Sequence, residues 1–233
     1  MGIPVLILGE SGSGKSTSMR NFEPDEIGVF NVAGKPFPFR KKLPAYNNAG
    51  YDLIYARLPR RDQNGNFPEK YRRAYVIDDS QYLMAFASFA RAKEKGYGKF
   101  TDFAVDFFSL IHFVVNEMPP DCIVYFLNHV ETGENGMIKI KTVGKMLDSQ
   151  LTVEGLFSIV LLCRATKDRH CFITQSEGIS TAKSPMGMFQ AEIDNDLKSV
   201  DTTIREYWGL APLTGKKKEE KTENKEEKPD VAR

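Results

Sequence analysis

Eight consecutive residues near the start of the chain have types and a spacing that suit phosphate chemistry. They match the pattern G-x-x-x-x-G-K-[ST] at every position: Gly9, Glu10, Ser11, Gly12, Ser13, Gly14, Lys15 and Ser16. Glycines let the backbone approach phosphate closely, and successive amides at a helix N-terminus donate hydrogen bonds to phosphate oxygens. In this pattern the lysine reaches the outer phosphates and the next hydroxyl coordinates Mg²⁺. The segment, with Thr17 adjoining it, therefore predicts a nucleotide site in which Ser16 is a metal ligand.

Two acids follow an apolar run at residues 74–77. Parallel sheets place their ligands at the carboxyl ends of strands, so we expect Asp78 beside the glycine loop, where it would hold Mg²⁺ through water. Asp79 could act as the base that orients an attacking water during hydrolysis. Short acidic residues also cap helices, and Asp79 precedes a helix expected to start near Ser80. The residues alone leave both roles of Asp79 open.

Another polar pair, Asn128 and His129, follows the apolar run at residues 122–127. At a strand end, either side chain could sense the terminal phosphate of a nucleotide, which makes both of them candidate catalytic residues together with Lys15 and Asp79. An ordinary surface or loop role for His129 is the alternative. The three histidines of the chain share no metal-ligand spacing, so the sequence does not predict a histidine metal site.

Short apolar runs alternate with amphipathic stretches along the chain, which is typical of a parallel sheet covered by helices. Strands are expected at residues 3–8, 27–32, 51–58, 74–77, 122–127, 157–163 and 171–174. Helices are expected at residues 15–21, 81–95, 102–117 and 200–208. The last two strands follow each other closely and predict a hairpin. The expected fold class is α/β, with a mostly parallel central sheet flanked by helices and a C-terminal antiparallel extension.

Length and composition indicate one domain. The chain has 233 residues, of which 41% are apolar, and this is enough for a sizeable core. We expect the domain to cover residues 1–214 and a disordered tail to cover residues 215–233, where charged residues dominate without apolar periodicity. No run of 18 apolar residues predicts a membrane helix, and the first residues do not resemble a signal peptide. Three cysteines without a pairing pattern indicate reduced thiols, which favours a cytoplasmic protein.

Two loops combine basic and aromatic residues in a way that suits single-stranded DNA. They cover residues 35–42 and 57–73. Bases can stack on aromatic rings while cations follow the phosphate backbone. The net charge of +1 argues against a protein that binds nucleic acid with its whole surface, so any such contact must be local. A solvated basic face is the other interpretation of these loops.

The order of these motifs resembles that of the RecA-type P-loop ATPases, in particular the compact ones that bacteriophages encode in replication and recombination modules. The resemblance covers roughly residues 3–210. It rests on the segments Gly9–Ser16, Thr142–Lys145 and Ala182–Ser184, on Asp78, and on Asn128 with His129. It implies ATP and Mg²⁺ as cofactors, single-stranded DNA as a partner, self-assembly into a homo-oligomer, and the host cytoplasm as the location.

The chain departs from this family pattern at one position. RecA-like proteins usually carry a catalytic glutamate just after the second strand, whereas residues 30–35 read Phe-Asn-Val-Ala-Gly-Lys, with Ala33 and no acid. Hydrolysis would then be slow, or would depend on Asp79 or on a neighbouring subunit. Two other classes stay open: a nucleoside or nucleotide kinase with residues 59–73 as its lid, and a nucleotide-gated interaction module with little turnover.

Overall fold

The structure, a computed structural model, describes residues 1–96, 98–133, 136–144 and 151–213. Within these residues an eight-stranded sheet has the order β10-β9-β8-β1-β5-β4-β2-β3. Its strands are β1 (Ile3–Leu8), β2 (Ile27–Asn31), β3 (Ala45–Asn47), β4 (Ala74–Asp78), β5 (Ile123–Asn128), β8 (Ile159–Ala165), β9 (His170–Ile173) and β10 (Glu192–Asp194). A separate two-stranded sheet joins β6 (Val130–Thr132) to β7 (Ile138–Ile140).

Six neighbouring strands, from β8 to β3, run parallel, and β9 and β10 extend the sheet in antiparallel pairing. The predicted mostly parallel sheet with a C-terminal antiparallel extension is therefore confirmed. The central strands β1, β4 and β5 are almost wholly buried, as their continuous apolar sequences require for strands covered on both faces. Register pairs Leu8 with Asn128 and Asn31 with Asp78, so the polar strand ends meet at one edge of the sheet.

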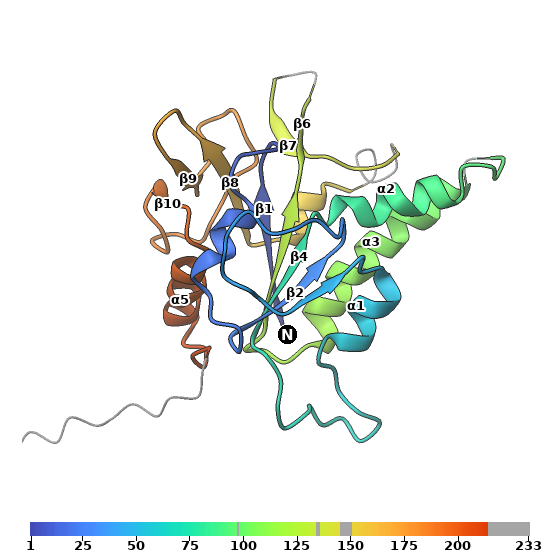
Figure 1. Cartoon of the computed structure of the whole chain (residues 1–233), viewed down its shortest axis with the longest axis horizontal. Coiled ribbons are helices and arrows are strands. Elements are labelled where there is room, and N and C mark those ends of the chain that lie inside the picture. The colour runs from blue at the N-terminus through green and yellow to red at the C-terminus, as the bar shows by residue number, and fades with distance from the viewer. Residues whose placement is uncertain (97, 134–135, 145–150, 214–233) are drawn as a thin grey trace, which may run out of the picture.

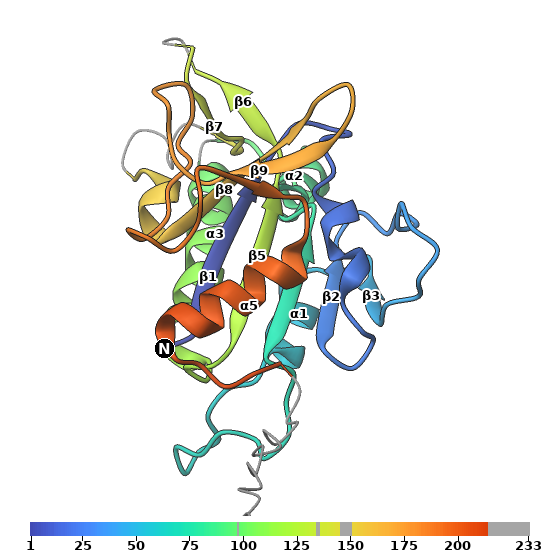
Figure 2. The same ribbon diagram turned by 90° about the vertical axis from the view of Figure 1, so that its left-hand side faces the viewer.

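Helices cover both faces of the sheet (Figures 1 and 2). The first face carries α1 (Tyr51–Arg57), α2 (Gln81–Ala90) and α3 (Gly98–Glu117), and the second carries η1 (Ser16–Asn21) and α5 (Leu197–Trp208). A short helix, η2 (Val153–Leu156), precedes β8. Alternate residues of β1 enter the two apolar cores, since Leu6 packs toward α3 and Ile7 packs toward α5. No helix in the described ranges has the length and apolarity needed to cross a membrane.

Residues 51–58 were expected to form a strand, and this prediction is wrong. They form α1, with Gly50 in extended conformation as its N-cap. Tyr51, Ile54, Tyr55 and Leu58 repeat at helical spacing and pack on the core, while Asp52 points to solvent. The density of apolar and aromatic residues resembles a strand, but their period is that of a helix. The short edge strand β3, which was not predicted, pairs with β2 instead.

Other boundaries differ more modestly. The first predicted helix is a 3₁₀ helix that begins at Ser16, and the helix expected at residues 81–95 ends at Ala90. Helix α5 begins at Leu197, three residues earlier than expected, because the Asp196 side chain accepts hydrogen bonds from the amides of Lys198 and Ser199. The β6–β7 hairpin and β10 were not predicted, since their strands are only three residues long.

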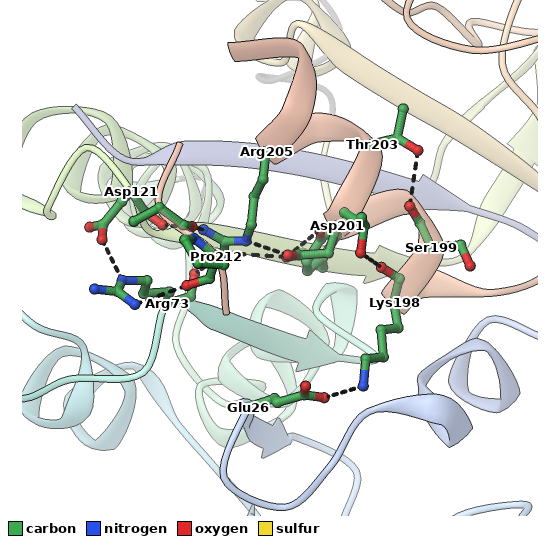
Figure 3. Close-up of polar contacts among 12 residues, drawn as sticks. Glu26, Arg73, Asp121, Lys198, Ser199, Asp201, Thr203, Arg205 and Pro212 are labelled. Carbon is green, nitrogen blue, oxygen red and sulfur yellow. Dashed lines mark hydrogen bonds and ion pairs between the residues drawn. The ribbon is translucent and has the colours of Figure 1, made fainter. Parts of the chain in front are cut away.

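A buried ion pair fastens α5 to the sheet end that lies opposite the polar strand ends (Figure 3). Arg205 pairs with Asp201 one helical turn away, and Tyr125 Oη on β5 donates a hydrogen bond of 2.8 Å to Asp201 Oδ2. The guanidinium also donates to Asp121 O at 2.9 Å and to Arg73 O at 2.8 Å. Burial raises the pKa of Asp201, while Arg205 and Tyr125 oppose that rise. The network joins α5 to the chain segments that lead into β4 and β5.

Candidate functional site

The glycine loop of residues 9–15 connects β1 to η1 at the edge where the parallel strands end (Figure 1). Gly12 has a φ of 79° and Gly14 a φ of 102°, backbone conformations that favour glycine. A Cβ atom at Gly14 would lie only 2.9 Å from His170 Nδ1, and one at Gly9 would lie 2.4 Å from Ser13 Oγ. Glycine is therefore required at these positions by backbone conformation or by space, as expected for a loop that curls tightly.

Lys15 is buried within this loop. Its Nζ donates hydrogen bonds to Gly9 O at 2.7 Å and to Glu10 O at 2.8 Å. Burial lowers the pKa of Lys15, although the nearby Asp79 and Asp78 carboxylates oppose that effect. An ammonium group is thus held inside the curve of the loop, beside backbone amides that could bind an anion.

Ser16 and Asp78 lie together as predicted. Ser16 Oγ donates a hydrogen bond of 2.8 Å to Asp78 Oδ1 at the end of β4. Burial raises the pKa of Asp78 to about 6, and the neighbouring charge of Asp79 adds to the rise. Ser16 and the lysines Lys35 and Lys15 oppose it. The negative charge of Asp78 is therefore only partly compensated by its neighbours, which makes this carboxylate a favourable site for a cation.

This pair of oxygen ligands suits Mg²⁺, which prefers hard oxygen donors and keeps several waters. Among the described residues, no group of three or more His, Cys, Asp or Glu side chains could hold a metal ion. A cation at Ser16 and Asp78 would therefore need water or ligand oxygens to complete its coordination. Those two residues fit a metal ion that arrives with a phosphate ligand.

Asp79 faces two potential cations. Its Oδ2 lies 2.6 Å from Lys35 Nζ, and its Oδ1 lies 3.2 Å from His129 Nε2. The backbone φ of Asp79 is 59°, the left-handed region that Asp tolerates better than most residues. Burial alone would raise the pKa of Asp79, but His129 and Lys35 outweigh burial and hold it below its usual value. Asp79 is therefore an anion, and it lines a cleft between the glycine loop and the strand ends.

The alternative role of Asp79 as a helix cap is wrong. Helix α2 has Ser80 as its N-cap residue, and no side chain makes a capping hydrogen bond there. Only the backbone of Asp79 contributes, because its carbonyl accepts a hydrogen bond from the Tyr82 amide at 2.9 Å. The side chain of Asp79 makes no capping contact and instead lines the cleft.

The side chains of Asn128 and His129 have different surroundings. Asn128 is fully buried, with Oδ1 accepting a hydrogen bond from Ser80 Oγ at 2.8 Å and Nδ2 donating to Lys141 O at 3.2 Å. It fastens the end of β5 to α2 and to the residue after β7. His129 instead lines the cleft beside Asp79, and its ring centroid lies 5.9 Å from that of Tyr82. Of the two candidates, only His129 faces the cleft.

The cleft brings together the loop, the strand ends and two side chains that the sequence did not predict there. Its lining includes Lys15, Ser16, Lys35, Asp78, Asp79, His129 and His170. Lys35 was expected in a DNA-binding loop. It lies only four residues after the end of β2, and because parallel strands end at one edge of the sheet, this closeness could have indicated that Lys35 lies near Asp78. His170 begins β9, and no local signal in the sequence connects it with the loop.

Strand β8 and the two antiparallel strands beyond it support the glycine loop. Cys163 Sγ on β8 donates a hydrogen bond to Ser13 O at 3.1 Å, and His170 Nδ1 lies 2.8 Å from the same oxygen. Asn195 Nδ2, after β10, donates to Cys163 Sγ at 3.2 Å. Burial raises the pKa of Cys163 to about 11, so it is a neutral thiol. The later strands thus fix the shape of a loop near the start of the chain.

The two basic and aromatic loops do not form one surface. Residues 59–73 precede β4 and lie at the end of the sheet opposite the glycine loop (Figure 1). The Phe37 and Phe39 rings stack with their centroids 5.4 Å apart and pack on the core. Arg61 Cζ lies 4.1 Å from the centroid of the Phe67 ring. These rings already have partners within the chain.

Two predictions fall on residues that the structure does not describe. Lys145, the last residue of the Thr142–Lys145 segment, lies outside the described residues, and so do the residues of the expected tail at 215–233. Lys183, in the other late segment, pairs through its backbone with Val160 of β8. No protein-family model and no curated protein sequence matches the chain.

Proposed function

We propose that the chain is a P-loop ATPase of the RecA-like type that binds ATP with Mg²⁺ and hydrolyses it. The observation that carries this proposal is the convergence of Lys15, Ser16 and Asp78 at the end of two parallel strands. Loop amides and Lys15 would hold the outer phosphates, and Ser16 and Asp78 would hold the metal. Bound Mg²⁺ would neutralise phosphate charge.

Asp79 is the proposed base. Its carboxylate would accept a proton from the attacking water, and His129 would orient that carboxylate from its other side. No glutamate follows β2, where RecA-like proteins usually carry one, so the proposal assigns this task to the residue after the metal ligand. The ionised state of Asp79 supports the assignment, because only the anion can accept a proton.

The kinase alternative has less support. Its expected lid, residues 59–73, lies at the opposite end of the sheet from the glycine loop (Figure 1). A lid there could not close over a phosphate bound at Lys15. The third class, a nucleotide-gated module with little turnover, differs from an ATPase only in rate.

The test is release of phosphate from Mg²⁺–ATP, with EDTA removing the metal in a parallel reaction. We expect turnover that depends on Mg²⁺ and no phosphate transfer to added nucleosides. Binding without turnover would favour the nucleotide-gated module, and absence of nucleotide binding would refute the whole proposal. Single-stranded DNA and self-assembly are proposals that rest on the family resemblance. They are tested by adding DNA to the same assay and by measuring particle size with nucleotide present.

A further inference from the structure

The backbone of Lys35 has a fixed position beside the cleft. Gly34 has a φ of 65°, and a Cβ atom there would lie 2.3 Å from Asn48 Oδ1. Buried Asn31, the last residue of β2, donates a hydrogen bond from Nδ2 to Lys35 O at 2.7 Å. Since Asn31 pairs in register with Asp78, Lys35 is anchored next to the end of β4, which Asp79 directly follows.

The side chain of Lys35, in contrast, lies mostly in solvent. It is 61% exposed, whereas the Asp79 side chain that it contacts is 5% exposed. The Tyr82 ring lies 6.0 Å from its Nζ. A hydrogen bond to Asp79 raises the pKa of Lys35, so the ammonium is protonated. A flexible four-carbon stem on a fixed backbone lets this charge move within the cleft.

Asp79 and a bound phosphate would compete for the Lys35 ammonium. Lys35 lines the same cleft as Lys15 and Ser16. While its Nζ lies 2.6 Å from Asp79 Oδ2, Lys35 occupies a carboxylate oxygen that would accept the proton of an attacking water. A terminal phosphate carries more negative charge than one carboxylate and offers several acceptor oxygens. It would therefore draw the ammonium away from Asp79.

We propose that Lys35 moves from Asp79 to the terminal phosphate of a bound nucleoside triphosphate and thereby releases Asp79 to act as the base. The inference rests on the proposed function. In the reaction, the water oxygen bonds to the terminal phosphorus as the bond to the bridging oxygen breaks, and the water proton passes to Asp79. A diphosphate lacks the terminal group, so Lys35 stays on Asp79 when a diphosphate is bound.

The test compares two affinities of the Lys35→Ala variant, for a non-hydrolysable ATP analogue and for ADP, both with Mg²⁺. Loss of one charge-assisted contact should weaken analogue binding about tenfold and change ADP binding less than about twofold. Lys35→Arg should recover part of the loss. The matched control is Lys198→Ala, because Lys198 also pairs with a largely buried acid, Glu26 (Figure 3), but lies on α5 and does not line the cleft. Equal changes for both nucleotides, or none for the analogue, would overturn the inference.

A second measurement uses Asp79→Asn. Without its carboxylate partner Lys35 no longer has to leave an ion pair, so analogue affinity should rise, and this gain should vanish in the Lys35→Ala, Asp79→Asn double variant. A gain that persists without Lys35 would contradict the inference. A wild-type protein that binds neither nucleotide refutes the proposed function instead, which keeps the two failures apart. Thermal melting of each variant verifies that it folds.

Discussion

Ser16 Oγ and Asp78 Oδ1 lie 2.8 Å apart although 62 residues separate them in the sequence. The hydroxyl belongs to the start of η1 and the carboxylate to the end of β4, so the hydrogen bond joins the glycine loop to the end of a strand two positions from β1 in the sheet. It does not fully compensate the buried charge, because the pKa of Asp78 is still raised to about 6. The site therefore holds a carboxylate whose ionisation opposes folding.

Asp78→Asn should stabilise the metal-free protein near pH 7.5. The folded-state pKa of about 6 exceeds the ordinary value of 3.8, so the wild-type protein loses stability as pH rises from 4 to 6, and the neutral amide does not. At about 1.4 kcal/mol per pKa unit, the variant should gain about 3 kcal/mol in the free energy of unfolding. Urea unfolding without Mg²⁺ measures the gain, which should shrink toward pH 4.5.

The control for this prediction is Asp25→Asn at an exposed turn, where a change of charge should matter little at either pH. A gain for Asp78→Asn that is the same at pH 4.5 and pH 7.5 would show that burial of charge is not its cause. Mg²⁺ with ATP should stabilise the wild-type protein more than the variant, because the variant lacks the anionic metal ligand.

Lys15→Ala should weaken binding of Mg²⁺–ATP by at least about 100-fold, since it removes charge-assisted contacts worth about 1.5 to 3 kcal/mol each. The carbonyls of Gly9 and Glu10, which accept hydrogen bonds from Lys15, would then have to find water. Titration calorimetry measures the affinity, and thermal melting verifies the fold. Lys198→Ala should bind like the wild-type protein. Unchanged ATP affinity in Lys15→Ala would refute the phosphate site.

Asp79→Asn should reduce ATP hydrolysis by at least about 100-fold, because an amide cannot accept the proton that a general base takes. Asparagine tolerates the left-handed backbone at this position, where φ is 59°, so the fold should persist. Phosphate release in single-turnover reactions measures the chemical step, and equilibrium titration measures binding. Hydrolysis at the wild-type rate would show that another group accepts the proton.

Much of the fold follows from local signals. Strands such as β1 and β5 are continuous apolar runs that end in polar residues, and both the runs and their polar ends were predictable. Because parallel strands end at one edge, the meeting of Ser16 with Asp78 was predictable too. The helix at Tyr51–Arg57 is harder to predict, because its many apolar and aromatic residues are typical of a strand and only their spacing indicates a helix.

The remaining features depend on contacts between distant segments. Lys35 reaches Asp79 because Gly34 and Asn31 turn the chain after β2. The types of these two residues do not predict the direction of that turn. His170 meets the carbonyl of Ser13 across 157 residues, through the pairing of β8 with β9. Such contacts are set by sheet order, which the sequence pattern does not specify.

Arg205→Met should lower the free energy of unfolding by about 3 to 5 kcal/mol, because it leaves the buried Asp201 carboxylate without its cation. The side chains of Arg205 and Asp201 are 5% and 0% exposed, so water cannot replace the lost partner. Adding Asp201→Asn should restore part of the stability, since the amide oxygen can still accept the Tyr125 hydrogen bond without carrying a charge. Urea unfolding at pH 7.5 measures both variants. A double variant no more stable than Arg205→Met would show that the unpaired charge is not the cause of the loss, and that the lost hydrogen bonds to the Asp121 and Arg73 carbonyls dominate.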